Sequence, residues 1–240
     1  MGTFRTQLVG REEVAEGTMA FRLARPSGFE FIAGQSMNVG LVDPSETDAK
    51  GNRRTFSIVS APFEGELMVA TRMRDTAFKR VLKTMPAGGE VELRGPAGTF
   101  LLEGNDSRPA VFLAGGIGIT PFVSMLRQAA KERLPRKLRL FYSNRRPEDA
   151  AFLEELAELH RRNPNYRFVG TMTEMEKSHR PWQGETGFID GRMLVRYIDD
   201  MPYAIYYTAG PPAMVEAMQN TLVQAGVKEE NIRSDEFYGY

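Results

Sequence analysis

The spacing of apolar residues changes near position 105, and this change constrains the fold most strongly. Before it, short segments of alternating polarity are separated by glycine or proline about every ten residues, a pattern typical of an antiparallel β-barrel. These segments are 3–9, 17–26, 35–42, 53–62, 65–73 and 89–98. One helix is predicted among them over 76–85, with Thr76 as its N-cap and an apolar stripe on one side.

After residue 108 the chain alternates strand-like with helix-like runs, which predicts βαβ units around a parallel sheet. The strand-like runs are 109–115, 137–143, 166–172 and 204–210, and the helix-like runs are 121–133, 147–162 and 211–226. We therefore expect two domains, 1–104 and 105–240, joined by a linker over 103–109.

Composition excludes several classes of protein. Thirty-one basic residues balance 31 acidic ones, so no net field attracts nucleic acid or an anionic membrane. The absence of cysteine excludes disulfides, thiolate-bound zinc and cysteine-ligated iron–sulfur clusters in this sequence. The two histidines are nineteen positions apart, so no metal site is expected. No stretch has the length of a signal peptide or a membrane span, and we expect a soluble, cytoplasmic protein.

Three glycines, Gly115, Gly116 and Gly118, follow the first strand of the second half. In an open parallel sheet, ligands bind outside the carboxyl ends of the strands, and a helix N-terminus there attracts phosphate. Thr120 is a suitable cap for the following helix. A second strand of the predicted sheet also ends in glycine, at Gly210, followed by Pro211, and we call these two strand ends the glycine edges. The glycines are interpreted as clearance for a nucleotide; the alternative is a tight turn in which small residues serve packing.

The segment "RRTFSIVS" is a candidate site in the first half. Alternation on a strand puts Arg54 and Phe56 on one face and Thr55 and Ser57 on the other. The Arg54 guanidinium suits bidentate contact with phosphate. From the residues alone, a solvated strand with one core aromatic is equally consistent.

Together these segments resemble the ferredoxin–NAD(P) reductase superfamily. "RTFS" matches its flavin motif R-x-[Y/F]-[S/T], "GGIGITP" is similar to its nicotinamide-nucleotide loop, and "AGPPAM" is similar to its second nucleotide loop, C-G-P-x-x-M. The motifs occur in the family's order, and the ending "DEFYGY" resembles the aromatic C-terminus of many members.

The resemblance implies a six-stranded FAD-binding barrel followed by a Rossmann-like domain for NADH or NADPH. Arg54 would contact the FAD phosphates, Phe56 would pack on the flavin, and Ser57 would hydrogen-bond near flavin N5. The backbone N–H groups of Thr76 and Ala77 would face the pyrophosphate. The complete set of flavin-site residues it implies is Arg54, Thr55, Phe56, Ser57, Thr71, Arg72, Met73, Arg74, Thr76 and Ala77.

The same resemblance implies a nicotinamide nucleotide on the second half, close to the flavin. Its implied contacts are Gly115, Gly116, Gly118, Thr120, Ser143, Asn144, Arg145, Gly210, Pro211 and Phe237. Arg145 and Arg146 are either a solvated loop or the binding site of a 2′-phosphate, and NADH is slightly favoured over NADPH. Ala209 replaces the family's usual cysteine, which puts the turnover rate in doubt but not the type of reaction.

For catalysis the resemblance implies Ser57, Glu236 and Phe237, with Phe237 covering the flavin face; Tyr240 is the alternative aromatic. The expected activity is hydride transfer from NAD(P)H to FAD, followed by electron transfer to a separate ferredoxin, flavodoxin or oxygenase component. Two alternatives stay open: a flavin-binding subunit of a larger complex without its own turnover, and a nucleotide-binding module without flavin.

Overall fold

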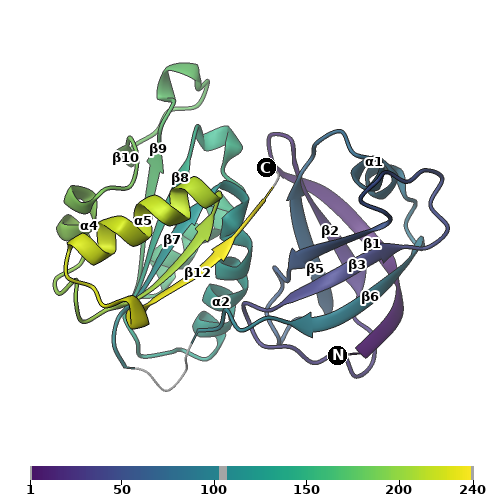
Figure 1. Ribbon diagram of the computed structural model, residues 1–240, viewed down its shortest axis with the longest axis horizontal. Helices are drawn as coiled ribbons and strands as arrows, with labels where there is room; N and C mark the ends of the chain where they lie inside the picture. The colour runs from purple at the N-terminus through teal and green to yellow at the C-terminus, as the bar shows by residue number, and fades with distance from the viewer. Residues whose placement is uncertain (1, 103–106, 239–240) are drawn as a thin grey trace. The chain divides into compact units, whose positions relative to one another are not determined.

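The computed structural model describes residues 2–102 and 107–238, which form two compact units (Figure 1). The first comprises the residues up to Leu102 together with Thr120–Gln128, and the second comprises those from Ser107 to Ile119 and from Ala129 to Tyr238. The boundary predicted between 104 and 105 lies outside the described residues. The predicted linker is described only from Ser107 onward.

The first unit is built on an antiparallel sheet of six strands in the order β4-β3-β6-β1-β2-β5. The strands are β1 (Gly2–Ala15), β2 (Thr18–Ala24), β3 (Ser36–Leu41), β4 (Arg53–Ser57), β5 (Glu66–Arg72) and β6 (Glu90–Ala97). The residues after β4 join the two ends of this sheet, because Val59 N donates to Met68 O at 2.8 Å. Each of the six strands predicted for the first half is present in this sheet, and β1 extends beyond its predicted end.

The interior of this sheet is filled by alternate strand residues, as the polarity pattern predicted. Leu8, Phe21 and Leu93 are at most 1% exposed. Helix α1 (Ala77–Thr84) adds Phe78 and Leu82 to the same core, each 1% exposed. The apolar stripe predicted for this helix thus holds it against the strands.

The first part of α2 (Thr120–Lys131) packs within the first unit, which the sequence did not indicate. Ser124 Oγ donates to Ser60 O at 2.7 Å, and Arg127 forms an ion pair with Glu64 at 3.3 Å. Gly34 permits the approach, since a Cβ there would lie 2.4 Å from Met125 Cε. Residues 120–126 are buried on all sides of the helix.

The second unit contains a parallel sheet in the order β10-β9-β8-β7-β11-β12. Its strands are β7 (Ala110–Gly115), β8 (Leu138–Asn144), β9 (Tyr166–Met172), β10 (Glu185–Thr186), β11 (Ile205–Gly210) and β12 (Ile232–Glu236). Helix α5 (Pro212–Gln224) crosses one face of the sheet (Figure 1). Val111, Leu113 and Tyr206 belong to the core cluster that includes Met218 and Leu222 of α5, so these strand residues face that helix.

Two elements differ from the prediction. The helix expected over 147–162 is broken, because Phe152 has a left-handed backbone (φ 60°) between a 3-10 turn at Pro147–Asp149 and α3 (Leu153–Arg162). A helix that was not predicted, α4 (Gly191–Tyr197), follows β10, and its N-cap Asp190 accepts from Met193 N at 2.7 Å. At seven residues, α4 is too short to give a clear helical period.

Candidate functional site

Of the two backbone donors predicted at the N-terminus of α1, that of Thr76 is already used, because Thr76 N donates to Arg74 O at 2.9 Å. Thr76 is the N-cap, with an extended backbone, and its Oγ1 accepts from Lys79 N at 3.4 Å. The N–H group of Ala77 points to a carboxylate, that of Asp48. An anion is therefore already held at this helix terminus by a donor that the helix itself does not use.

Arg54 lies beside this terminus. Its Nη2 contacts the two carboxylate oxygens of Asp48 at 3.0 and 3.2 Å, and its Nη1 donates to the backbone oxygens of Lys50, Gly51 and Arg53. The guanidinium also lies 5.2 Å from the ring centre of Phe78, on the helix. The arginine of the "RTFS" motif and the α1 N-terminus thus converge on one carboxylate.

Positive charge gathers around the same point. Burial first, and then the nearby cations Arg74, Arg54 and Lys50, lower the pKa of Lys79 to about 8. The Lys79 Nζ donates to Arg72 O at 2.6 Å, a neutral partner that does not offset those charges. Four cations around a helix N-terminus suit a ligand with two phosphate charges. The diphosphate of FAD fits this donor set.

Of the other residues of the motif, Phe56 has a role in the core. Phe56 is 6% exposed and lies in the core, 5.9 Å from Phe78 between ring centres. Ser57 is 7% exposed, whereas Thr55 is exposed and accepts from Asn38 Nδ2 at 3.3 Å. The core thus accounts for the burial of Phe56, so its contact with flavin stays a prediction. Of the predicted segment after β5, Thr71 is fully buried and Arg74 is exposed.

The predicted glycine edge lies at the carboxyl end of β7, and only one of its three glycines has open space. A Cβ at Gly115 would lie 2.3 Å from Met214 Sδ, and one at Gly118 would lie 2.3 Å from Ala209 O. A Cβ at Gly116 would meet nothing within 4 Å, and its φ is +52°. Clearance for a ligand is thus the wrong explanation for Gly115 and Gly118. Gly115 makes room for Met214 of α5, Gly118 allows the loop to approach the end of β11, and of the three only Gly116 borders a space that a ligand can enter.

Asn144, at the carboxyl end of β8, carries the second sign of a ligand site. It is 6% exposed, and both its side-chain Oδ1 and Nδ2 are buried with no hydrogen-bond partner among the described residues. Thr208 Oγ1, on β11, is likewise buried and unpaired in the described part of the chain. Buried polar atoms without partners are costly, and a bound nucleotide with hydroxyl and amide groups offers such partners. The strand ends therefore fit a dinucleotide.

The two arginines after β8 share one carboxylate. Asp149, which is 5% exposed, contacts Arg146 at 2.9 Å and Arg145 at 3.4 Å. The Arg145 side chain is 53% exposed and that of Arg146 is 19% exposed. Both cations are thus partly neutralised within the protein, which reduces the charge available to a 2′-phosphate. Ser143 ends the same strand, in register with Gly115.

On β12, the predicted acid Glu236 and its neighbour Asp235 face opposite sides of the sheet. Gln219 of α5 donates to Ser234 Oγ at 3.1 Å, so Ser234, and by alternation Glu236, lie on the α5 side. Asp235 is in register with Ala209 and shares its face. Burial raises the pKa of Asp235, whereas Glu236 is exposed and accepts from the Tyr238 hydroxyl.

Phe237 continues the chain beyond β12. It is half-buried, and its N–H donates to Gly210 O at 3.0 Å, which fixes its backbone at the second glycine edge. Pro211 precedes α5 there. Tyr240, the alternative aromatic, lies outside the described residues. The sequence analysis missed Asp48, Asp149 and Asp235, since an isolated acid gives no motif.

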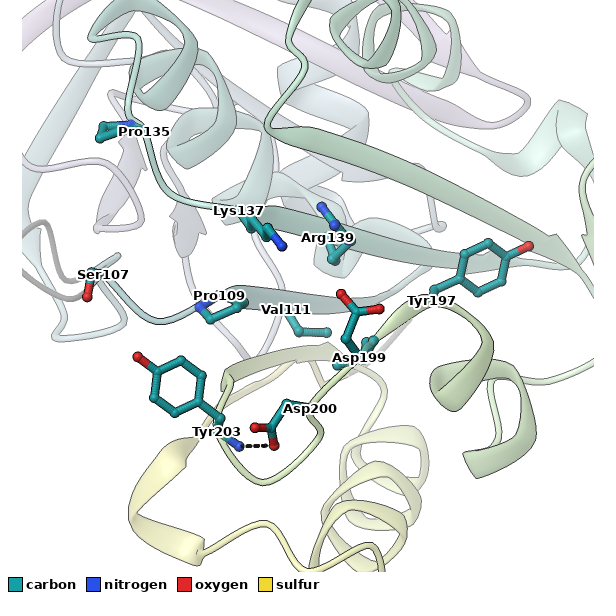
Figure 2. A pocket seen from close by; sticks show the side chains of 11 residues that line it. Ser107, Pro109, Val111, Pro135, Lys137, Arg139, Tyr197, Asp199, Asp200 and Tyr203 are labelled. Carbon is teal, nitrogen blue, oxygen red and sulfur yellow. Dashed lines mark hydrogen bonds between the residues drawn. The ribbon is translucent and has the colours of Figure 1, made fainter.

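A cavity of about 410 Å³ lies at the other end of the parallel strands (Figure 2). It is lined by the starts of β7 and β8, with Lys137 and Arg139 on one side and Asp199 and Asp200 on the other. Burial, with the neighbouring Arg167, lowers the pKa of Arg139. Two acidic and two basic side chains line this cavity, so its charge favours no class of ligand. The cavity is separate from the candidate nucleotide site, which lies at the carboxyl ends of the strands.

Comparison with known proteins identifies relatives of both units. A family model described as the oxidoreductase NAD-binding domain matches residues 112–220. The reductase component of propane 2-monooxygenase from Rhodococcus jostii (strain RHA1) is 28% identical over 242 residues, covering 97% of this chain and 63% of the relative. The reductase component of phenol 2-monooxygenase from Pseudomonas sp. (strain CF600) is 29% identical, covering 90% of this chain and 60% of the relative. The chain thus spans 60 to 63% of the length of these relatives.

Solved structures agree on the fold. A ferredoxin NADP+ reductase from Neisseria gonorrhoeae, crystallised with bound FAD and NADP, superposes with a TM-score of 0.81 at 23% identity and covers 98% of each chain. That likeness concerns the architecture alone. The chain thus shares the two-unit fold of a ferredoxin NADP+ reductase, and its residues 112–220 are similar to oxidoreductase NAD-binding domains.

Proposed function

We propose that this protein is a flavin-dependent reductase that takes electrons from NAD(P)H and delivers them to a separate acceptor. The observation that carries the proposal is the convergence of Arg54 and the Ala77 N–H on one anion position in the first unit, with Arg54 also part of a cluster of cations around Lys79. When bound, the two cofactors supply the redox chemistry, hydride transfer to the flavin and onward electron transfer. The protein binds and orients them.

In the first unit, Arg54 and the N–H of Ala77 would hold the FAD diphosphate, with Lys79 and Arg74 adding charge. A charged donor on a phosphate contributes about 1.5–3 kcal/mol. Ser57, at the end of β4, keeps its predicted role near flavin N5. The flanking Thr71–Arg74 segment is continuous with the α1 N-cap, which supports its predicted place along the same cofactor.

In the second unit, the space at Gly116 and the unpaired amide of Asn144 would receive the nicotinamide nucleotide. We infer NADH rather than NADPH, because Asp149 already occupies Arg145 and Arg146. We also infer that Asp235, rather than Glu236, is the acid near the reacting end, since it shares a face with Ala209. Phe237 keeps its predicted role beside the flavin.

The acceptor is proposed to be an oxygenase component or a ferredoxin. Both curated relatives are reductase components of monooxygenases, which supports the first of these. These 240 residues contain no cysteine to ligate an iron–sulfur cluster, so the flavin is the electron carrier proposed within them. No helix in the described part of the chain is long and apolar enough to cross a membrane. A cytoplasmic location stays part of the proposal.

Loading with FAD tests the flavin part of this proposal. The protein stripped of cofactor should bind FAD, with quenching or a shift of the flavin bands. Arg54→Ala should weaken binding by roughly ten- to a hundredfold, in line with the loss of one charged phosphate contact. Arg22→Ala is the matched control, because Arg22 pairs with Glu66 on another part of the sheet. Equal affinity of the two variants for FAD would remove Arg54 from the site.

A further inference from the structure

The loop between β3 and β4 places an acid where the cofactor's phosphates are proposed to bind. Asp48 accepts hydrogen bonds from Arg54 Nη2 and from the backbone N–H of Ala77. Lys50 N also donates to Asp48 Oδ1, at 2.9 Å. The carboxylate therefore uses the two donors that the FAD diphosphate needs, one from β4 and one from the α1 N-terminus.

A second acid of the same loop holds it against α1. Glu46 Oε1 accepts from Arg80 Nε at 2.9 Å, and Arg80 also forms an ion pair with Asp75, just before the helix. Glu46 and Asp48, two positions apart in the sequence, thus attach one short segment to the helix at two points. This attachment keeps the Asp48 carboxylate at the α1 N-terminus.

The contacts of the Asp48 carboxylate are those expected of a bound anion at the surface, not those of a side chain enclosed in the core. The Arg54 side chain is 19% exposed and that of Asp48 is 29% exposed, so the pair is accessible from solvent. Hydrogen bonds from Lys50, Arg54 and Ala77 outweigh the effect of burial and keep the pKa of Asp48 low. The group is therefore a stable anion, paired with Arg54, which is one of the cations that lower the pKa of Lys79.

We propose that Asp48 is an internal competitor for the FAD diphosphate, occupying Arg54 and the Ala77 N–H until the cofactor displaces it. This inference rests on the proposed flavin function. Two anions cannot share these donors, so the Asp48 carboxylate must leave when the diphosphate binds. Asp48 then sets the affinity for FAD, and the loop between β3 and β4 changes position as the cofactor enters or leaves.

The test measures FAD affinity of the full chain, freed of cofactor, by flavin fluorescence or calorimetry. Asp48→Asn should bind FAD about tenfold more tightly, because the variant keeps the shape of the side chain and loses the charge that competes. Asp43→Asn is the matched control: it removes the same charge from the same loop, at an exposed position with a positive φ that asparagine tolerates. It should leave FAD affinity within about twofold.

Two further arms isolate the diphosphate. Riboflavin, which has no phosphate, should bind Asp48→Asn and the parent protein equally. In an Arg54→Ala background, Asp48→Asn should give no gain in FAD affinity, since the competed donor is gone. Melting curves establish that each variant is folded.

The outcomes separate this inference from the function on which it rests. If the parent protein binds FAD and Asp48→Asn binds it no more tightly, the inference is wrong and the flavin function stands. An equal gain for riboflavin also overturns it, because the effect would then not concern phosphate. If no form of the protein binds FAD, the flavin function itself fails, and the role of Asp48 fails with it.

Discussion

Binding of FAD should take up protons through Lys79. Residue Lys79 is 9% exposed, and the pKa of its ammonium group falls from 10.5 to about 8 because of burial and the cations Arg74, Arg54 and Lys50. A shift of that size corresponds to about 3 kcal/mol against the charged form. A bound diphosphate places negative charge among these cations, so it should return the pKa of Lys79 toward its ordinary value.

The number of protons taken up follows from the protonation of Lys79 in the free protein and in the FAD complex. At pH 8 about half of the free protein has a neutral Lys79, so binding should take up about half a proton per FAD. At pH 6.5 Lys79 is charged in both states and the uptake should approach zero. Because the complex holds more protons than its parts, raising the pH must weaken binding, by about threefold per pH unit near pH 8.

Calorimetry of FAD binding in buffers with different ionisation enthalpies measures this uptake directly. Lys79→Met should abolish it, and Lys79→Arg should abolish it while keeping the positive charge. If the parent protein takes up no protons at pH 8, or if Lys79→Met takes up as many, then Lys79 does not face the cofactor phosphates. The reasoning about the cation cluster would then be wrong.

The remaining predictions concern the second unit. Gly116→Asn should weaken NADH binding at least tenfold and leave FAD affinity unchanged, because asparagine accepts the positive φ but fills the open space; equal NADH affinity would remove Gly116 from the site. Gly118→Ala should lower the melting temperature, since its Cβ would lie 2.3 Å from Ala209 O, and an unchanged melting curve would contradict that packing role. Phe237→Ser should tighten nicotinamide binding several-fold, as stacking of about 0.5–1.5 kcal/mol is lost, and should shift the flavin bands. Deleting Tyr240 should do neither, and the reverse result would exchange their roles.

The order and type of the elements could be predicted from the sequence because they depend on local patterns. Glycine and proline mark the ends of the barrel strands, and long apolar runs mark the central strands of the parallel sheet. The Thr76 cap and the α1 stripe were visible for the same reason. The break at Phe152 was not, because no residue type there signals a left-handed backbone.

The candidate site could likewise be predicted only where a local motif marks its residues. The motifs singled out Arg54, the α1 N-terminus and the two glycine-containing strand ends as candidates. They did not separate a glycine that borders open space, Gly116, from one that packs against the neighbouring strand, Gly118, because that depends on a strand distant in the sequence. Nor did they reveal Asp48 or Asp149, whose roles arise only when the chain brings them to an arginine.

The central claim is that this chain passes electrons from a nicotinamide nucleotide to its own bound flavin. Anaerobic titration of the FAD-loaded protein with NADH, and separately with NADPH, tests it most directly. We predict that the flavin absorbance bleaches at one equivalent of NADH, and at lower concentration with NADH than with NADPH. A flavin that binds but stays oxidised with both nucleotides would contradict the claim and favour a subunit without its own turnover.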